Sequence, residues 1–211
     1  MVGFNRRFAP VLREAKHLFQ PRQTPLVIHY RINAGFVPRT HWIQDPLEGG
    51  GRILGEICHF VDTILYLTEA TPVTVYAEAI TSTHTDIVEA DNVNITIKLS
   101  DGSVGVITYV ALGDIRAGKE RIEIFGGSAV FMLNDFKTAE FVQKNHKPKI
   151  LKARSKGHRE EVRAFIEALH VNGPTPIDFK SLVLTTITTL TIQDSLHQKR
   201  PLDISSPHSN P

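Results

Sequence analysis

The sequence predicts an α+β protein built on an open, mainly antiparallel multi-strand β-sheet with helices packed on one face. Three observations support this prediction. The middle third is a run of segments in which apolar residues recur at every second position. The links between these segments are short, which favours antiparallel pairing because parallel neighbours need long crossovers. Both ends of the chain carry apolar residues at helical spacing instead.

The first third predicts one helix and one strand. Apolar residues recur at helical spacing through 10–19 after Pro10, a residue that commonly begins a helix. Residues 24–35 are β-branched and aromatic between a proline and a glycine, which predicts a strand. A connection with prolines, glycines and aromatic residues spans 36–51 and leads to a second apolar segment.

The middle third predicts consecutive strands. The strand segments are 72–81, 92–100, 103–112, a hairpin within 120–135, and 138–143. Asp101-Gly102 and Gly126-Gly127 supply the positive φ that tight hairpin turns require. In the strand 103–112 neither alternating face is strongly polar, so we expect the free sheet face to be buried against another subunit.

The last third predicts two helices. The first covers 157–173, with a buried stripe, and Gly173-Pro174 ends it. The stripe consists of Val162, Phe165, Ile166 and Leu169. The second segment, 178–196, has the β-branched content of a strand but the length, spacing and Asp178 N-cap of a helix, and we interpret it as a helix. We expect one domain over 1–204 and a disordered tail over 205–211.

Composition narrows the class of protein. The 211 residues are 41% hydrophobic and 22% charged with a net charge of +2, as in soluble globular proteins. The basic run 144–159 is interpreted as a solvated connection rather than a nucleic-acid site. One cysteine allows no intrachain disulfide, and no apolar run approaches the ~20 residues of a membrane span. A signal peptide is not evident, so the expected location is cytoplasmic, with no membrane partner.

The segment "GGGRILGEICHFVDTILYL", residues 49–67, combines a helix with a candidate site. On a helical wheel its apolar residues share one side, and the opposite side carries Gly55, Arg52, His59, Thr63, Glu56 and Asp62. His59 lies near the middle of this polar side, with Glu56 and Thr63 one turn away. An imidazole on a rigid helix beside a carboxylate and a hydroxyl is suited to acid–base chemistry at neutral pH. The wheel points Cys58 away from His59, and we interpret it as a packing residue.

A purely structural interpretation competes with this site. Glu-x-x-His also occurs at Glu14/His17 and Glu167/His170, and such pairs often only support a helix. A di-iron carboxylate bundle would need four facing helices, which the strand-rich middle does not supply. A metal-dependent hydrolase that uses the histidines is a weak third hypothesis, and no metal ligands are assigned.

Five motifs occur in an order typical of one family. They are "VGFNRRFAP", "GGGRILGEICHFVD", "FGGSAVFMLND", "KGHREEVRAFIEAL" and "SLVLTTITTLTIQDSL". From about residue 2 to about residue 204, the chain resembles the C-terminal part of the glucose–fructose oxidoreductase/inositol dehydrogenase (Gfo/Idh/MocA) family. The resemblance implies an open sheet whose free face pairs subunits into a homodimer or larger homo-oligomer.

The resemblance also implies a chemistry. Family members transfer a hydride between a sugar-like or polyol substrate and NAD or NADP, which binds an N-terminal Rossmann domain. No G-x-G-x-x-G motif of such a domain is present here. We therefore expect this chain alone to bind no cofactor and to be inactive. The alternative is a non-catalytic dimerisation or regulatory module with the same fold.

Site residues follow from the resemblance. His59 matches the family's proton-transfer histidine, and Asp62 the common His-x-x-Asp pattern. Many members carry Asp four residues before the histidine, where this chain has Gly55 followed by Glu56. The candidate catalytic residues are His59, Glu56 and Asp62. The candidate substrate-binding residues are Arg31, Asn33, His41, Trp42 and Thr63, and the candidate cofactor-binding residues are Asn5, Arg6 and Arg7.

Overall fold

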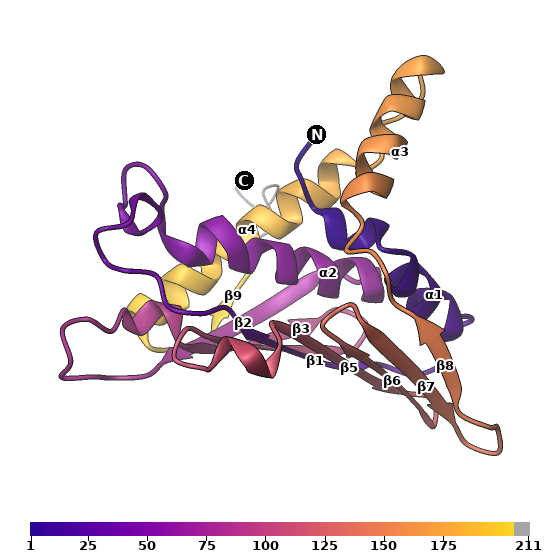
Figure 1. Ribbon diagram of the computed structural model, residues 1–211, viewed down its shortest axis with the longest axis horizontal. Coiled ribbons are helices and arrows are strands. Elements are labelled where there is room, and N and C mark those ends of the chain that lie inside the picture. The colour runs from indigo at the N-terminus through magenta and orange to yellow at the C-terminus, as the bar shows by residue number, and fades with distance from the viewer. Residues whose placement is uncertain (205–211) are drawn as a thin grey trace.

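The computed structural model describes residues 1–204 and shows one open sheet with helices on one face (Figure 1). Within these residues the sheet has nine strands in the order β8-β7-β6-β5-β1-β4-β3-β2-β9. β1 (Val27–Asn33) pairs parallel with β4 (Val104–Val110), and the other neighbours pair antiparallel. The predicted α+β class is confirmed. The predicted tail 205–211 lies outside the described residues.

The remaining strands follow the predicted segments closely. They are β2 (Pro72–Ala79), β3 (Val93–Leu99), β5 (Glu120–Gly126), β6 (Ala129–Asn134) and β7 (Thr138–Gln143). Two edge strands were not predicted, β8 (Lys149–Lys152) and β9 (Leu202–Asp203). Each is too short for a period-2 pattern to stand out, and the lysines that protect an exposed edge make β8 resemble a connection.

Four helices lie on the sheet or beside it within the described residues. They are α1 (Pro10–Leu18), α2 (Cys58–Thr68), α3 (His158–His170) and α4 (Phe179–Gln198). The ambiguous segment 178–196 is therefore helical, and the Asp178 side chain caps it by accepting a hydrogen bond from the Ser181 backbone N–H at 2.9 Å. None of the described helices is long and apolar enough to cross a membrane.

α2 lies at the centre of the core. Its apolar side, formed by Phe60, Val61 and Ile64, is fully buried. The Phe60 ring meets Tyr30 of β1 with ring centroids 4.9 Å apart, and Tyr109 of β4 at 6.2 Å. This packing fixes α2 against the middle strands and so fixes the position of the residues on its other side.

The predicted helix over 52–68 contains an irregularity. Residues Ile53–Ile57 form a π turn, and the Cys58 backbone N–H bonds to the Ile53 carbonyl five residues earlier. α2 continues from Cys58 to Thr68. Such turns accommodate one extra residue and are frequent at functional sites.

The predicted buried stripe of α3 is wrong. Val162, Ile166 and Leu169 are exposed, Leu169 to 61%, and only Phe165 is half-buried. α3 packs mainly on the 3-10 turn Asn5–Phe8 and stands out from the layer of helices (Figure 1). Periodicity indicates which side of a helix is apolar, but none of residues 1–204 covers that side of α3.

Candidate functional site

His59 lies in the first turn of α2, immediately after the π turn. It is half-buried, and Phe4 meets the imidazole edge-on with centroids 5.5 Å apart. The imidazole lines a cavity of about 440 Å³, together with the thiol of Cys58. The helical wheel separated these two side chains, but the structure places both on the cavity. Burial raises the pKa of Cys58 to about 11, so its thiol is neutral at physiological pH.

The protonation of His59 is set by its surroundings. Burial, and then the positive charge of Arg6, lower its pKa to about 4. Its Nδ1 atom is buried and has no hydrogen-bond partner among the described residues. At neutral pH the ring is therefore neutral, with Nδ1 free of protein partners. Such a group is chemically able to exchange a proton with a hydroxyl placed in the cavity.

Glu56 is committed to a network of donors. Its carboxylate accepts hydrogen bonds from Tyr109 Oη at 2.5 Å, Lys119 Nζ at 2.5 Å and Arg52 Nη2 at 2.9 Å. Burial acts to raise its pKa, but these hydrogen bonds outweigh burial and lower the pKa to about 2. Glu56 is thus a fixed negative charge near His59, and it contributes to the field at the imidazole.

Asp62 and Thr63 are fully buried, although the helical wheel placed them on a polar side. The Asp62 carboxylate accepts hydrogen bonds from both Arg7 Nη2 and Arg7 Nε, the latter at 3.0 Å. The Thr63 hydroxyl donates to the His59 carbonyl oxygen at 2.8 Å. The 3-10 turn Asn5–Phe8 covers this side of α2, and the Asp62–Arg7 pair ties the two together.

A second buried pair holds the same turn. Arg6 donates from Nε and Nη2 to Glu120, at 2.7 and 2.9 Å, and Tyr30 Oη and Lys156 Nζ also donate to this carboxylate. Burial acts to raise the pKa of Glu120, but Arg6 and Tyr30 lower it to about 2. Asn5 donates to the Lys156 carbonyl oxygen at 2.6 Å. Each of the three candidate cofactor residues therefore donates at least one side-chain hydrogen bond within the protein.

The candidate site residues did not include six members of these networks, which are Tyr30, Arg52, Tyr109, Lys119, Glu120 and Lys156. The sequence pattern of β5 could have identified one of them, Glu120. Glu120 shares an alternating register with Ile122 and Ile124, so it belongs to the buried side of β5. A carboxylate in an apolar register requires a buried partner, which here is Arg6.

The candidate substrate residues separate into two groups. Arg31 and Asn33, on β1, donate to the carbonyl oxygens of Gly118 at 3.0 Å and Asp114 at 2.7 Å. His41 and Trp42 are exposed on the connection, where their rings lie 5.8 Å apart. None of these four side chains lines the His59 cavity. Among residues 1–204, no three His, Cys, Asp or Glu side chains gather into a candidate metal site.

The family of the chain follows from a comparison with known protein families. A profile of the GFO/IDH/MocA C-terminal domain matches residues 23–131, about half of the chain. The chain belongs to this family, as the order of its motifs implies. Comparison with curated protein sequences gave no match.

Solved structures show the same fold. The oxidoreductase domain protein from Kribbella flavida superposes with a TM-score of 0.79 at 18% identity, over 98% of this chain and 66% of that one. The aldose–aldose oxidoreductase from Caulobacter crescentus, solved with glycerol, gives 0.79 at 15% identity, over 96% and 63%. An NAD binding oxidoreductase from Klebsiella pneumoniae gives 0.77 at 16%, over 97% and 65%. The chain thus spans about two thirds of these proteins.

Proposed function

We propose that this chain is the substrate-binding and oligomerisation domain of an NAD(P)-dependent oxidoreductase that acts on a sugar-like or polyol substrate. The observation that carries the proposal is the neutral, half-buried His59, which lines the cavity and forms no Nδ1 hydrogen bond with any of residues 1–204. Family membership supports the reaction class. The name of the Caulobacter crescentus protein, which acts on aldoses, supports the substrate class.

In the proposed reaction this chain accepts and returns the proton of the substrate hydroxyl. When an alcohol is oxidised, its hydroxyl proton must leave, and we assign the imidazole of His59, which lines the cavity, to accept it; in the reverse direction the imidazole returns the proton. Glu56 and Asp62 act as positioning residues in this proposal. Glu56 fixes a negative charge near the ring, and Asp62 holds the turn that covers α2. Thr63 anchors the backbone of His59.

Hydrogen bonds within the protein hold the three candidate cofactor residues in place. Asn5 donates to the Lys156 carbonyl oxygen, Arg6 to Glu120 and Arg7 to Asp62. We therefore place NAD or NADP on a separate domain and assign these three residues to the wall that faces it. The exposed apolar stripe of α3, which projects beside the Asn5–Phe8 turn, is the surface we expect that domain to cover.

A titration with NADH tests whether the cofactor binds a separate domain rather than this chain. The chain alone is expected to leave NADH fluorescence unchanged, because the proposal places the dinucleotide on the separate domain. The same chain preceded by the dinucleotide-binding part of the Klebsiella pneumoniae oxidoreductase is expected to bind it. Binding by the chain alone in the low micromolar range would contradict the proposal.

The open face of the sheet is the proposed homo-oligomer interface. On β4, Val104, Val106 and Val110 lie on this face and are half-buried, while Ile107 and Tyr109 point into the core. Apolar side chains on a sheet face that no helix covers are typical of a subunit interface.

Val106→Glu is expected to convert the oligomer to a monomer, because it places a charge in the middle of this face. Light scattering coupled to size-exclusion chromatography measures the mass. Arg159→Glu on exposed α3 is the control and is expected to leave the mass unchanged. A wild-type chain that is monomeric throughout the accessible concentration range would refute the interface.

The second candidate function is a non-catalytic dimerisation or regulatory module. Glu56 favours it, because its carboxylate is bonded to three donors and is not free to act beside His59. The two functions differ in what substitution of His59 does to turnover.

A further inference from the structure

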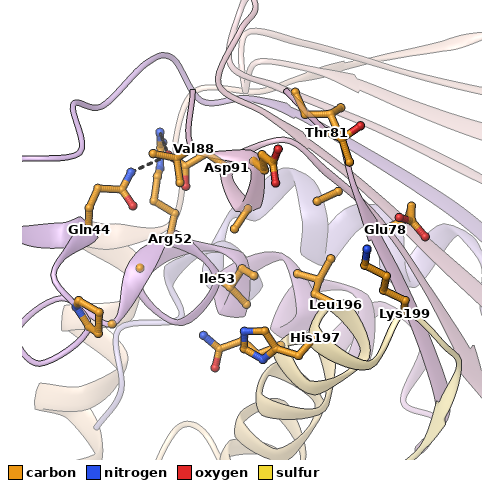
Figure 2. A pocket seen from close by; sticks show the side chains of 18 residues that line it. Gln44, Arg52, Ile53, Glu78, Thr81, Val88, Asp91, Leu196, His197 and Lys199 are labelled. Carbon is orange, nitrogen blue, oxygen red and sulfur yellow. Dashed lines mark hydrogen bonds and ion pairs between the residues drawn. The ribbon is translucent and has the colours of Figure 1, made fainter. Parts of the chain in front are cut away.

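A second cavity has a volume of about 490 Å³, and Figure 2 shows the side chains that line it. The connection before α2, the β2–β3 loop and the last turn of α4 enclose it. It shares no lining residue with the His59 cavity. Its volume lies within the ~300–1,000 Å³ that is usual for small-molecule sites. The inference drawn from it does not depend on the proposed function.

The floor of this cavity carries an unsatisfied donor. Arg52 is 4% exposed; its Nη1 donates to the Gly35 carbonyl oxygen at 2.7 Å, and its Nη2 to Glu56 at 2.9 Å. Its Nε–H is buried and has no partner among the described residues. Buried donors without partners are rare in proteins, and each one calls for an acceptor. Arg52 lines the cavity but its Nε has almost no accessible surface, so a ligand oxygen would reach Nε after a small rearrangement of the lining side chains.

The charges around Arg52 restrict the ligand. Asp91 is buried beside the guanidinium, with Oδ2 at 3.9 Å from Nη1, and Glu78 and Lys199 lie at the rim (Figure 2). Carboxylates oppose a free anion, and Arg52 with Lys199 opposes a cation. A hydroxyl group donates one hydrogen bond and accepts two, so it can serve carboxylate acceptors and guanidinium donors together.

The walls of the cavity are partly apolar. Ile53, Val88 and Leu196 present apolar surface between the polar groups (Figure 2). A ring that carries hydroxyls on its rim and C–H groups on its faces matches such a lining. We propose that this cavity binds a neutral, polyhydroxylated small molecule such as a sugar, with one ligand oxygen accepting from Arg52 Nε.

The Nε–H resonance of Arg52 provides a direct test, with D-glucose as the probe in a titration followed by ¹H–¹⁵N NMR. Glucose is expected to shift this resonance with a dissociation constant in the millimolar range, as for small neutral ligands. Ala90→Trp, which fills the cavity from the β2–β3 loop, is expected to weaken binding by about tenfold or more. Thr83→Trp on the same loop is the matched control and is expected to retain binding, since Thr83 does not line the cavity.

Additional measurements distinguish sugar binding in this cavity from binding in the His59 cavity and from anion binding. His59→Ala is expected to leave the shift unchanged, so binding that depends on His59 would assign glucose to the other cavity and overturn the inference. A larger shift with inorganic phosphate would make this an anion site and also overturn it. An unmoved resonance at saturating glucose would leave only water as the partner of Nε. Equal binding by the Ala90→Trp variant would place glucose outside the cavity.

Discussion

Replacement of His59 by glutamine is expected to lower kcat of the assembled two-domain enzyme by about 10²–10⁴-fold, the usual contribution of a positioned acid–base group. Glutamine preserves much of the volume of the imidazole but cannot exchange a proton. Because the cavity around it is retained, KM should change little. The measurement is steady-state kinetics with the chain joined to a dinucleotide-binding domain.

The pH dependence gives an independent check. The pKa of His59 is lowered to about 4 by burial and by Arg6, so the wild-type rate of alcohol oxidation should stay level through neutral pH. It should fall as the ring is protonated near pH 4. The unfolded-state pKa of histidine is ~6.5, so His59 makes no pH-dependent change to the free energy of unfolding above that pH. As the pH falls from ~6.5 through the folded pKa of about 4, the unfolded chain binds a proton that folded His59 does not, and the free energy of unfolding decreases. The glutamine variant should lack this decrease.

The control for His59 is His158→Gln at the start of α3. His158 is exposed and contributes a weaker charge effect at His59, so its loss should leave kcat nearly unchanged. A His59→Gln enzyme with wild-type turnover would remove His59 from the mechanism. That result would favour the non-catalytic module.

Asp62→Ala is expected to lower the free energy of unfolding by about 3–5 kcal/mol, because it leaves the Arg7 guanidinium buried without a counter-charge. Asp62 is fully buried, and the side chain of Arg7 is only 10% exposed. Urea denaturation followed by circular dichroism measures the change. The double variant Arg7→Met/Asp62→Leu should recover much of the loss, since it removes both charges and keeps apolar volume.

A surface ion pair serves as the comparison. Lys149 Nζ lies 2.7 Å from Glu14 Oε1, and the two side chains are 52% and 39% exposed. Lys149→Ala should therefore lower the free energy of unfolding by less than ~1 kcal/mol. If Asp62→Ala costs no more than Lys149→Ala, then Asp62 does not anchor the Asn5–Phe8 turn. Asp62 variants that remain folded should retain most of kcat in the assembled enzyme, as a positioning residue would.

Local patterns accounted for most of the fold. The β-branched and aromatic residues of 103–112 predicted a strand. Because neither of its alternating faces is strongly polar, the sequence alone did not show which face meets the core. The 20-residue length of α4 and its Asp178 cap outweighed its β-branched content. The short edge strands β8 and β9 were missed because so few residues cannot establish a period.

The site was harder to predict because it depends on contacts between distant segments. The helical wheel correctly gave Asp62 and Thr63 a side of α2 opposite the apolar residues, but it could not show that the turn Asn5–Phe8 covers that side. The partner of Glu120 lies 114 residues away, at Arg6. Likewise, the stripe on α3 was visible as a pattern, while its exposure depends on what lies opposite.

The π turn Ile53–Ile57 bears on how relatives of this chain should be aligned. In a regular α-helix the residue four positions before His59 would lie one turn before it on the same side. In the π turn the hydrogen bond spans five residues instead of four, so a different residue occupies that place. The glycine at position 55 is therefore not enough to say that this chain lost an acidic neighbour of the histidine. Superposed backbones, rather than residue counts, identify the side chain that occupies that place.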